Sequence, residues 1–421
     1  MQQTVAPTIE PGTSPAVATP ATAAPVAVTT FSILAFLGLS HFLNDVIQSL
    51  VPSIYPMLKT RLALDFSQIG LITFTFQGCA SLLQPLIGLL GDRKPRPWLL
   101  PSGMIATLIG LLALSRANNL SHLLVAAGMV VLGSSVFHPE ASRVARLASG
   151  GRHGLAQSMF QVGGNAGSAT GPLLAAFIVL PFGQGSIAWF SLVALLAILL
   201  LSRVATWHAA NRRPRATRAL AAAQALPRGR VVLAICVLFM LLMSKFIYTT
   251  SLSSYLTFYL IERFDVSVRD AQLILFAYLA AMAVGTLCGG PLGDRIGRKY
   301  VIWGSILGVL PFTLALPHVG LTATVVLVVV IGLIISAAFA AIIVYAQELV
   351  PGRVGMIAGV FFGLAFGISA LGAAALGALA DARGIDFVYM VCGFLPAIGL
   401  LAVLLPRSPR PANRFRVAAT K

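Results

Sequence analysis

Long apolar segments, each long enough to cross a lipid bilayer, alternate along this chain with short segments that contain most of its charges. A membrane-spanning helix needs roughly 20 apolar residues. We expect twelve such spans, at 31 to 58, 67 to 90, 98 to 115, 120 to 142, 154 to 180, 186 to 205, 231 to 261, 271 to 291, 300 to 317, 320 to 348, 355 to 380 and 385 to 406. The spans lack the strict alternation of barrel strands, and helices satisfy their own backbone hydrogen bonds in lipid. The pattern therefore predicts an all-α membrane protein.

The first span carries a polar stripe. Its residues follow the spacing i, i+3, i+4, i+7 that places them on one helix face, and they are His41, Asn44, Asp45 and Gln48. An aspartate within a span is costly in lipid, so it should face a protein interior or a water-filled pathway for ions or substrate. Since His41 and Asp45 lie one turn apart, they can share a proton. Alternatively, His41 bonds a backbone carbonyl and Asp45 is a fixed structural partner.

Composition supports the membrane assignment and limits the function classes. The 421-residue chain is 58% hydrophobic and only 10% charged, whereas soluble domains carry about 25% charged residues. Its four cysteines lie inside apolar segments without CxxC spacing, so we predict neither a disulfide framework nor a metal site. The net charge of +17 comes from residues between the spans, not from a basic groove with interleaved aromatics. We therefore expect no nucleic-acid partner.

The distribution of Lys and Arg predicts the orientation. The loops that follow even-numbered spans and the C-terminal tail hold 22 of these residues, and the opposite loops hold 6. Positively charged loops remain in the cytoplasm, so both termini and the segment 206 to 230 are predicted to be cytoplasmic. That basic segment would join two six-helix halves, 31 to 205 and 231 to 406, as a solvated linker or as a site for a cytoplasmic partner.

The remaining parts of the chain are two tails. Residues 1 to 30 are mostly Pro, Ala, Thr and Val with one charge, a composition that predicts a disordered cytoplasmic tail. Residues 407 to 421 form a second, basic cytoplasmic tail.

The two halves contain related sequences. Residues 88 to 93 (GLLGDR) and 290 to 295 (GPLGDR) match at an offset of 202, each directly after the second span of its half. Parallel repeats of this kind are typical of transporters that bind substrate between the halves, near the middle of the membrane.

These motifs resemble the major facilitator superfamily. Residues 290 to 299 (GPLGDRIGRK) are a full match to that family's loop motif, and the first copy keeps four of its residues but has Pro95 and Pro97 at two positions. The resemblance implies two pseudo-symmetric six-helix bundles and a latch that favours one facing state. Its gating residues would be Gly88, Asp92, Arg93, Gly290, Asp294, Arg295, Gly297 and Arg298. The alternative interpretation of each motif is a solvated turn.

A further motif lies in the fifth span. Residues 167 to 172 (GSATGP) resemble the glycine and proline motif of the superfamily's exporters, although Ala175 and Ala176 replace the glycines expected after it. The spacing of Gly167 and Gly171 permits close helix packing, and Pro172 permits a bend for gating.

Three motifs give a narrower resemblance. Residues 41 to 45 (HFLND), 137 to 143 (FHPEASR) and 345 to 351 (YAQELVP) together resemble the fosmidomycin-resistance transporters. The likeness covers about 31 to 406 and implies a proton-coupled exporter in the bacterial inner membrane that acts as a monomer among lipids. Fosmidomycin is a phosphonate that carries a hydroxamate, so the implied cargo is a small antimicrobial anion. The energy source would be the proton gradient, with no other cofactor.

Lys245 is the only basic residue in the middle of a span. The offset of 202 places it near position 43, at a depth similar to that of Asp45. A buried lysine needs a partner, so we expect Asp45 to pair with it when cargo is absent and an anionic cargo to replace Asp45. Alternatively, the two residues form a permanent structural ion pair.

Three polar residues, His138, Glu140 and Arg143, come near the predicted cytoplasmic end of the fourth span, and Glu348 ends the tenth. They are candidates for a proton exit or a cytoplasmic gate. Alternatively, Glu140 and Arg143 pair with each other at the i, i+3 spacing, and Glu348 has a similar structural role.

Neutral polar side chains extend the stripes. The candidate cargo contacts among them are Asn44, Gln48, Gln77, Gln161, Asn165, Tyr248 and Tyr255. Each of them can instead serve helix packing.

The motifs of other function classes are absent from the sequence. No HExxH, GxSxG or P-loop occurs, which argues against a membrane enzyme and against ATP as the energy source. A non-transporting sensor would need an output domain, which neither the tails nor the linker provides. We therefore predict a secondary transporter, most simply a proton-coupled exporter, and proton-driven uptake of an organic anion would use the same residues.

Overall fold

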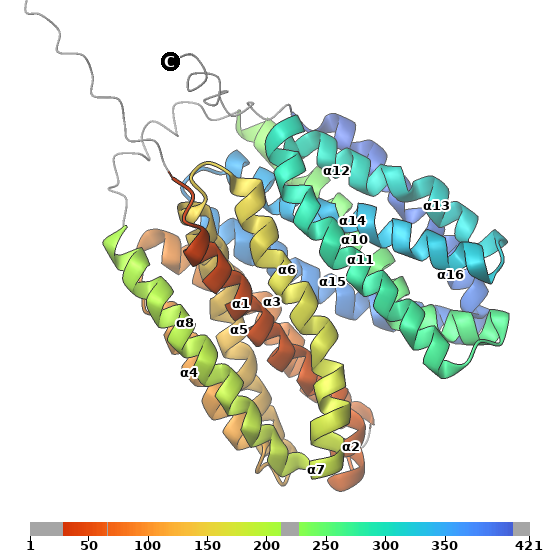
Figure 1. The fold of residues 1–421 in the computed structure, drawn as a ribbon, viewed down its shortest axis with the longest axis horizontal. Coiled ribbons are helices and arrows are strands. Elements are labelled where there is room, and N and C mark those ends of the chain that lie inside the picture. The colour runs from red at the N-terminus through yellow and green to blue at the C-terminus, as the bar shows by residue number, and fades with distance from the viewer. Residues whose placement is uncertain (1–27, 65, 212–226, 407–421) are drawn as a thin grey trace, which may run out of the picture.

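The computed structural model describes residues 28–64, 66–211 and 227–406, and every regular element within these ranges is helical (Figure 1). Eleven helices are long and apolar enough to cross a membrane, and the shorter apolar helix α4 (Leu99–Leu114) is the twelfth. The predicted all-α membrane fold of twelve apolar helices is confirmed.

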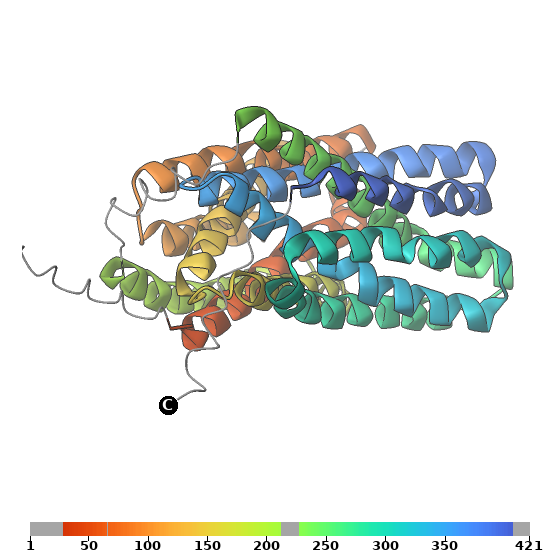
Figure 2. The same cartoon turned by 90° about the horizontal axis from the view of Figure 1, so that it is seen from above.

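The helices form two bundles that lie side by side in the perpendicular view (Figure 2). The N-terminal bundle contains α1 (Phe31–Ser53), α2 (Tyr55–Arg61), α3 (Phe66–Arg93), α4, α5 (Leu120–Ala148), α6 (His153–Leu174), η1 (Ala175–Val179), α7 (Leu180–Phe182), η2 (Gln184–Phe190) and α8 (Ser191–Ala210). The C-terminal bundle contains α10 (Arg228–Phe264), α11 (Val268–Ile296), α12 (Arg298–Ile306), η3 (Leu307–Val309), α13 (Leu310–Ala315), η4 (Leu316–His318), α14 (Leu321–Leu349), α15 (Val354–Arg383), α16 (Ile385–Gly393) and η5 (Leu395–Leu404).

Several helix ends differ from the prediction. The first span breaks at Ile54 into α1 and α2, after the proline Pro52. The helix of the fourth span, α5, extends six residues beyond the predicted end at 142. This is possible because its basic side chains bind other side chains of the protein: Arg146, for example, donates to Gln347 Oε1 at 3.3 Å. The α8 and α10 helices extend into the predicted linker at both of its ends.

Most of the predicted tails and linker lie outside the described residues, but the end of the first tail does not. The backbone N–H of Thr30 donates to the carbonyl of Ala148 at 2.9 Å, and the Thr29 hydroxyl donates to the carbonyl of Ser149 at 2.9 Å. The predicted disorder is therefore wrong for Thr29 and Thr30, which attach the start of α1 to the end of α5.

Side-chain caps and one proline determine local helix geometry. Asn119 accepts the backbone N–H of His122 at 2.9 Å and starts α5, and Ser267 accepts that of Asp270 at 3.1 Å and starts α11. After Pro172, which has no N–H to donate, α6 widens into the π-helical turn η1.

Glycines allow helices to touch within the N-terminal bundle and between the bundles. In α6, a Cβ at Gly167 or Gly171 would overlap with α1, as the small-residue spacing predicted. Between the bundles, a Cβ at Gly88 of α3 would overlap with the Gly355 carbonyl of α15, and one at Gly290 of α11 would overlap with the Gly154 carbonyl of α6. These two contacts close the interface at one end, which is the end that the charge distribution assigns to the cytoplasm.

In Figure 1 the two bundles lie together at this end and separate toward α2 and α7. The apolar core follows the same pattern. One cluster of buried side chains continues from the N-terminal bundle into α10, α12, α14, α15 and η5, whereas a second belongs to the C-terminal bundle alone.

A side chain at Gly88 should therefore open the closed end. We expect Gly88→Val to increase the rate at which a membrane-impermeant maleimide modifies a Ser158→Cys reporter, in a chain whose native cysteines are replaced by alanine. Ser158 is fully buried beside Gly290. If the substitution shifts the equilibrium between the two facing states by ~1.4 kcal/mol, the labelling rate should increase about tenfold.

The matched control for this substitution is Gly128→Val, because a Cβ at Gly128 meets no atom within 4 Å. Equal labelling rates in the two valine variants would contradict the role of the glycine contact.

Candidate functional site

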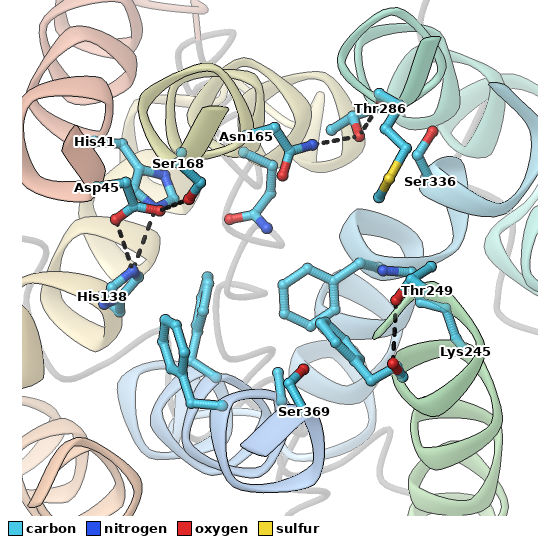
Figure 3. Close-up of a pocket in the computed structure, with 18 of the residues that line it drawn as sticks. His41, Asp45, His138, Asn165, Ser168, Lys245, Thr249, Thr286, Ser336 and Ser369 are labelled. Atoms are coloured by element: carbon cyan, nitrogen blue, oxygen red, sulfur yellow. Dashed lines mark hydrogen bonds and ion pairs between the residues drawn. The ribbon is translucent and has the colours of Figure 1, made fainter. Parts of the chain in front are cut away.

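A cavity of about 310 Å³ lies between the two bundles. Four helices of each bundle line it, namely α1, α3, α5, α6, α10, α11, α14 and α15. Its lining combines polar and charged side chains with phenylalanine rings. Figure 3 shows that the two kinds of charged group lie apart: His41, Asp45 and His138 are on one side, and Lys245 is on the other.

The first side of the cavity holds a compact cluster, called here the His–Asp triad: His41, Asp45 and His138. The two imidazole Nε2 atoms are 3.2 Å apart. The Asp45 carboxylate lies 3.5 Å from His41 Nε2 and 3.7 Å from His138 Nε2. All three residues are buried, with exposed fractions of 2%, 8% and 1%. The triad is therefore compact enough to share one small cation, of which the proton is the smallest.

Backbone carbonyls fix the tautomers of both histidines. His41 Nδ1 lies 2.7 Å from the carbonyl oxygen of Phe160, and His138 Nδ1 lies 3.0 Å from that of Ser134. A carbonyl can only accept a hydrogen bond, so a proton on each Nδ1 satisfies both contacts, and the Ser134 hydroxyl, 3.2 Å from His138 Nδ1, then acts as a further acceptor. In the neutral imidazoles, both Nε2 atoms are consequently acceptors, and their lone pairs face each other and the carboxylate.

Asp45 has further donors around it. The Asn44 amide donates to Oδ1 at 2.9 Å, and the Ser168 hydroxyl donates to Oδ2 at 3.4 Å. These bonds orient the carboxylate from α1 itself and from α6. A charged Asp45 is thus partly compensated inside the protein, as a buried carboxylate requires.

Lys245 of α10 lies on the opposite side of the cavity and is 4% exposed. Its Nζ lies 4.1 Å from the centre of the Phe246 ring and 5.2 Å from that of Phe339. Within the described residues it makes no hydrogen bond and no ion pair. Aromatic faces attract a cation but leave its three N–H donors without acceptors.

Two expectations about these residues are wrong. Asp45 pairs with the two histidines and not with Lys245, because similar depth in the membrane did not bring their helices into contact across the cavity. His138 lies beside Asp45 and not at the cytoplasmic end, because α5 continues for ten residues beyond it.

The structure brings only some of the predicted cargo contacts into the cavity. Gln77, Gln161 and Asn165 line it, and the Asn165 amide donates across the interface to Thr286 Oγ1 at 3.0 Å. The other four lie elsewhere. Asn44 orients Asp45, Gln48 donates to the Val130 carbonyl at 3.5 Å, Tyr248 is buried inside the C-terminal bundle, and the Tyr255 hydroxyl donates to the Ala373 carbonyl at 2.6 Å.

The two aspartates of the repeated motif form the same contact in each copy. Asp92, at the end of α3, accepts the backbone N–H groups of Gly355 and Met356 at 3.0 and 2.9 Å. Asp294, at the end of α11, accepts those of Gly154 and Leu155, both at 2.9 Å. Each carboxylate thereby caps the N-terminus of a helix in the other bundle, where free N–H donors and the helix dipole favour a negative charge.

A family model described as Major Facilitator Superfamily matches residues 37–268 and 235–420. The chain belongs to the major facilitator superfamily. This superfamily consists of membrane transporters that carry small molecules, so the prediction of a transporter that is not an enzyme is confirmed.

Relatives support the same assignment. The chain is 57% identical over 383 residues to the Fosmidomycin resistance protein of Escherichia coli (strain K12), covering 90% of this chain and 93% of that protein. It is 40% identical, with the same coverage, to the Uncharacterized MFS-type transporter YfnC of Bacillus subtilis (strain 168). The predicted resemblance to the fosmidomycin-resistance transporters is confirmed.

Solved structures share the fold. The transporter FucP in its outward conformation aligns with a TM-score of 0.71 and 16% identity, covering 90% of this chain and all of FucP. The human organic anion transporter MFSD10 (TETRAN) aligns with a TM-score of 0.70 and 15% identity, covering 89% and 99%.

The other predicted gating residues of this superfamily member are divided between the protein interior and its surface. Arg298 donates to Asp294 Oδ1 at 2.8 Å and lies 3.1 Å from the Glu348 carboxylate. Arg143 forms an ion pair with the buried Glu140. Arg93 and Arg295 are exposed, while Gly297 has a φ of +105° and makes the turn between α11 and α12. Glu140 and Glu348 thus belong to ion pairs outside the cavity.

Sequence reasoning missed the hydroxyl and aromatic lining of the cavity. These residues are Ser168, Thr249, Thr286, Ser336, Ser369, Phe246, Phe339, Phe362 and Phe366. Single hydroxyls and phenylalanines are common in membrane helices, so the only available signal was their position on the helix faces of the two bundles.

The unpaired ammonium of Lys245 should reduce stability. We expect Lys245→Met to raise the free energy of unfolding by about 1 to 3 kcal/mol, because methionine removes a buried charge that lacks hydrogen-bond acceptors and keeps most of the volume. The measurement is thermal unfolding of the purified protein in detergent.

The matched control is Lys299→Met. Lys299 Nζ donates to the carbonyls at the end of η5, at 2.7 Å to Val403, so its loss should lower stability. If Lys245→Met were also destabilising, the ammonium would have stabilising contacts that this geometry does not include.

Proposed function

We propose that this transporter is a secondary active exporter, which uses the proton gradient to move small antimicrobial anions such as fosmidomycin out of the cytoplasm by alternating access. It would lie in the bacterial inner membrane as a monomer, with both termini in the cytoplasm. The observation that carries the proposal is the cavity between the bundles, with a buried His–Asp triad on one side and a lone buried lysine on the other.

The direction of transport rests on the relatives. A protein named for fosmidomycin resistance is 57% identical over nearly the whole chain, and export is the simplest way in which a membrane transporter confers resistance. Fosmidomycin carries a phosphonate, and Lys245 offers a cation with unfilled donors to such a group.

The His–Asp triad is the candidate proton site. Its two facing Nε2 atoms and the carboxylate of Asp45 have more acceptors than donors, so the bound proton would lie among them. Buried ionisable groups of this kind mark proton relays in membrane transporters.

The two helix-cap contacts between the bundles support the proposal of alternating access. Asp92 and Asp294 hold the bundles together at the end that is predicted to be cytoplasmic, so the conformation described here would be closed to the cytoplasm. Breaking both helix-cap contacts would let the bundles rock about the cavity and open it to the cytoplasm.

Expression in a pump-deficient bacterial host should lower the accumulation of labelled fosmidomycin and raise resistance. We expect Asp45→Asn to return both quantities to the level of the empty vector, because an amide cannot provide the negative charge that keeps a proton in the triad. Membrane fractionation would verify that the variant is inserted in the membrane.

The matched control is Asp386→Asn, which removes a half-exposed carboxylate that pairs with Arg263 outside the cavity and should leave resistance intact. A rise in drug accumulation upon expression of the wild type would contradict export and favour proton-driven uptake.

A further inference from the structure

The two sides of the cavity are chemically complementary and do not touch each other. The N-terminal bundle supplies the His–Asp triad, which in its unprotonated form consists of acceptors: two imidazole lone pairs and a carboxylate. The C-terminal bundle supplies Lys245, whose ammonium carries three donors. The triad therefore lacks hydrogen-bond donors, Lys245 lacks acceptors, and the cavity lies between them (Figure 3).

The unprotonated triad is an unfavourable arrangement by itself. With both Nδ1 protons committed to carbonyls, the Nε2 lone pairs stand 3.2 Å apart and near a negative carboxylate. Nothing in the triad can donate a hydrogen bond among these atoms. A proton removes the repulsion, because one imidazolium then donates to the other imidazole or to Asp45. The donor of a bound molecule would serve the same purpose.

Within the described residues, no neighbouring side chain donates a hydrogen bond to either Nε2 atom. In the cavity lining, α6 faces the triad with Gly164 and with Ser168, whose hydroxyl already donates to Asp45, and α15 faces it with Phe362 and Phe366. Lys245 is the only other charged residue of this lining.

We infer that the exported molecule is a small anion with two functional ends: an acidic head that binds Lys245, and a hydrogen-bond donor that binds the His–Asp triad in place of the coupling proton. The inference rests on the proposed function and deepens it. Suitable donors are an ammonium or an N-hydroxy group, and suitable heads are a phosphonate or a carboxylate. The cavity of about 310 Å³ is at the small end of ligand sites, as such molecules require.

The donor end determines the direction of coupling. An anion that binds Lys245 alone would be bound more tightly when the triad is protonated and neutral than when it is negative. Proton and anion would then travel together, as in uptake. A donor group reverses this preference because it and the proton need the same lone pairs, so each displaces the other. Mutual displacement is the requirement for proton-driven export, and it is reciprocal.

Two phosphonic acids with the same three-carbon chain test the inference: 3-aminopropylphosphonic acid has both ends, and n-propylphosphonic acid lacks the donor. The wild-type protein is reconstituted in liposomes that contain a pH-sensitive dye, and a gradient of each compound is imposed. We expect the amino compound, like fosmidomycin, to drive protons in the opposite direction. The propyl compound, which binds Lys245 alone, should not, and any proton movement that it drives should follow the direction of its own gradient. If both phosphonic acids drive equal exchange, the two-ended cargo is wrong while the proposed export stands.

A variant of the triad separates the two ends. His138→Asn removes one Nε2 acceptor but leaves Lys245 in place. We expect it to weaken binding of 3-aminopropylphosphonic acid about tenfold or more, the loss of a charge-assisted hydrogen bond, with binding of n-propylphosphonic acid unchanged. Equal weakening of both compounds would overturn the assignment of the donor end. A wild-type protein that carries fosmidomycin without any proton movement would overturn the proton coupling of the proposed function and, with it, the competition inferred here.

Discussion

The cap that each motif aspartate places on a helix of the other bundle is the contact on which the rest of the structure depends. Asp92 and Asp294 each accept two backbone N–H groups that their own helices cannot satisfy. Gly88 and Gly290 make these contacts possible, because any side chain there would separate the bundles. Both caps lie at the same end. They therefore join the bundles without filling the interface, and the cavity lies farther along it.

Much of this frame, meaning the helices and their division into two bundles, could be predicted from the sequence. The length of the hydrophobic segments predicted the helices, and the repeat at an offset of 202 residues predicted the halves. The predicted segment ends were wrong where hydropathy does not indicate which protein groups a residue contacts. The fourth helix continues past Arg143 and Arg146, because protein partners and not lipid surround these side chains. Likewise, Thr29 and Thr30 were assigned to a tail by composition, but their hydrogen bonds to α5 order them.

The site was harder to predict than the frame. The sequence predicted that Asp45 and Lys245 are buried charges, and the repeat predicted that they lie at a similar depth. A similar depth, however, does not determine which helices pack together and which side chains meet. His138 joins His41 because α5 packs beside α1, a contact that the spacing along either helix does not encode. The orienting carbonyls of Phe160 and Ser134 are backbone groups, which any residue at these positions would provide. The tautomers therefore became assignable only from the structure.

The frame is pseudo-symmetric, but the cavity is not, and this difference connects binding to movement. The latches repeat in both bundles, so in the proposed alternating access they would control how the halves rock without selecting a cargo. The acceptors of the His–Asp triad belong to one bundle and the ammonium of Lys245 belongs to the other. A molecule that touches only one wall moves with that bundle and has the same binding energy in both facing states. It therefore shifts no equilibrium between them, however tightly it binds. A cargo with two unlike ends has contacts that depend on the separation of the walls and can bias the rocking, and a proton in the triad can do so through its electrostatic repulsion of Lys245 across the cavity.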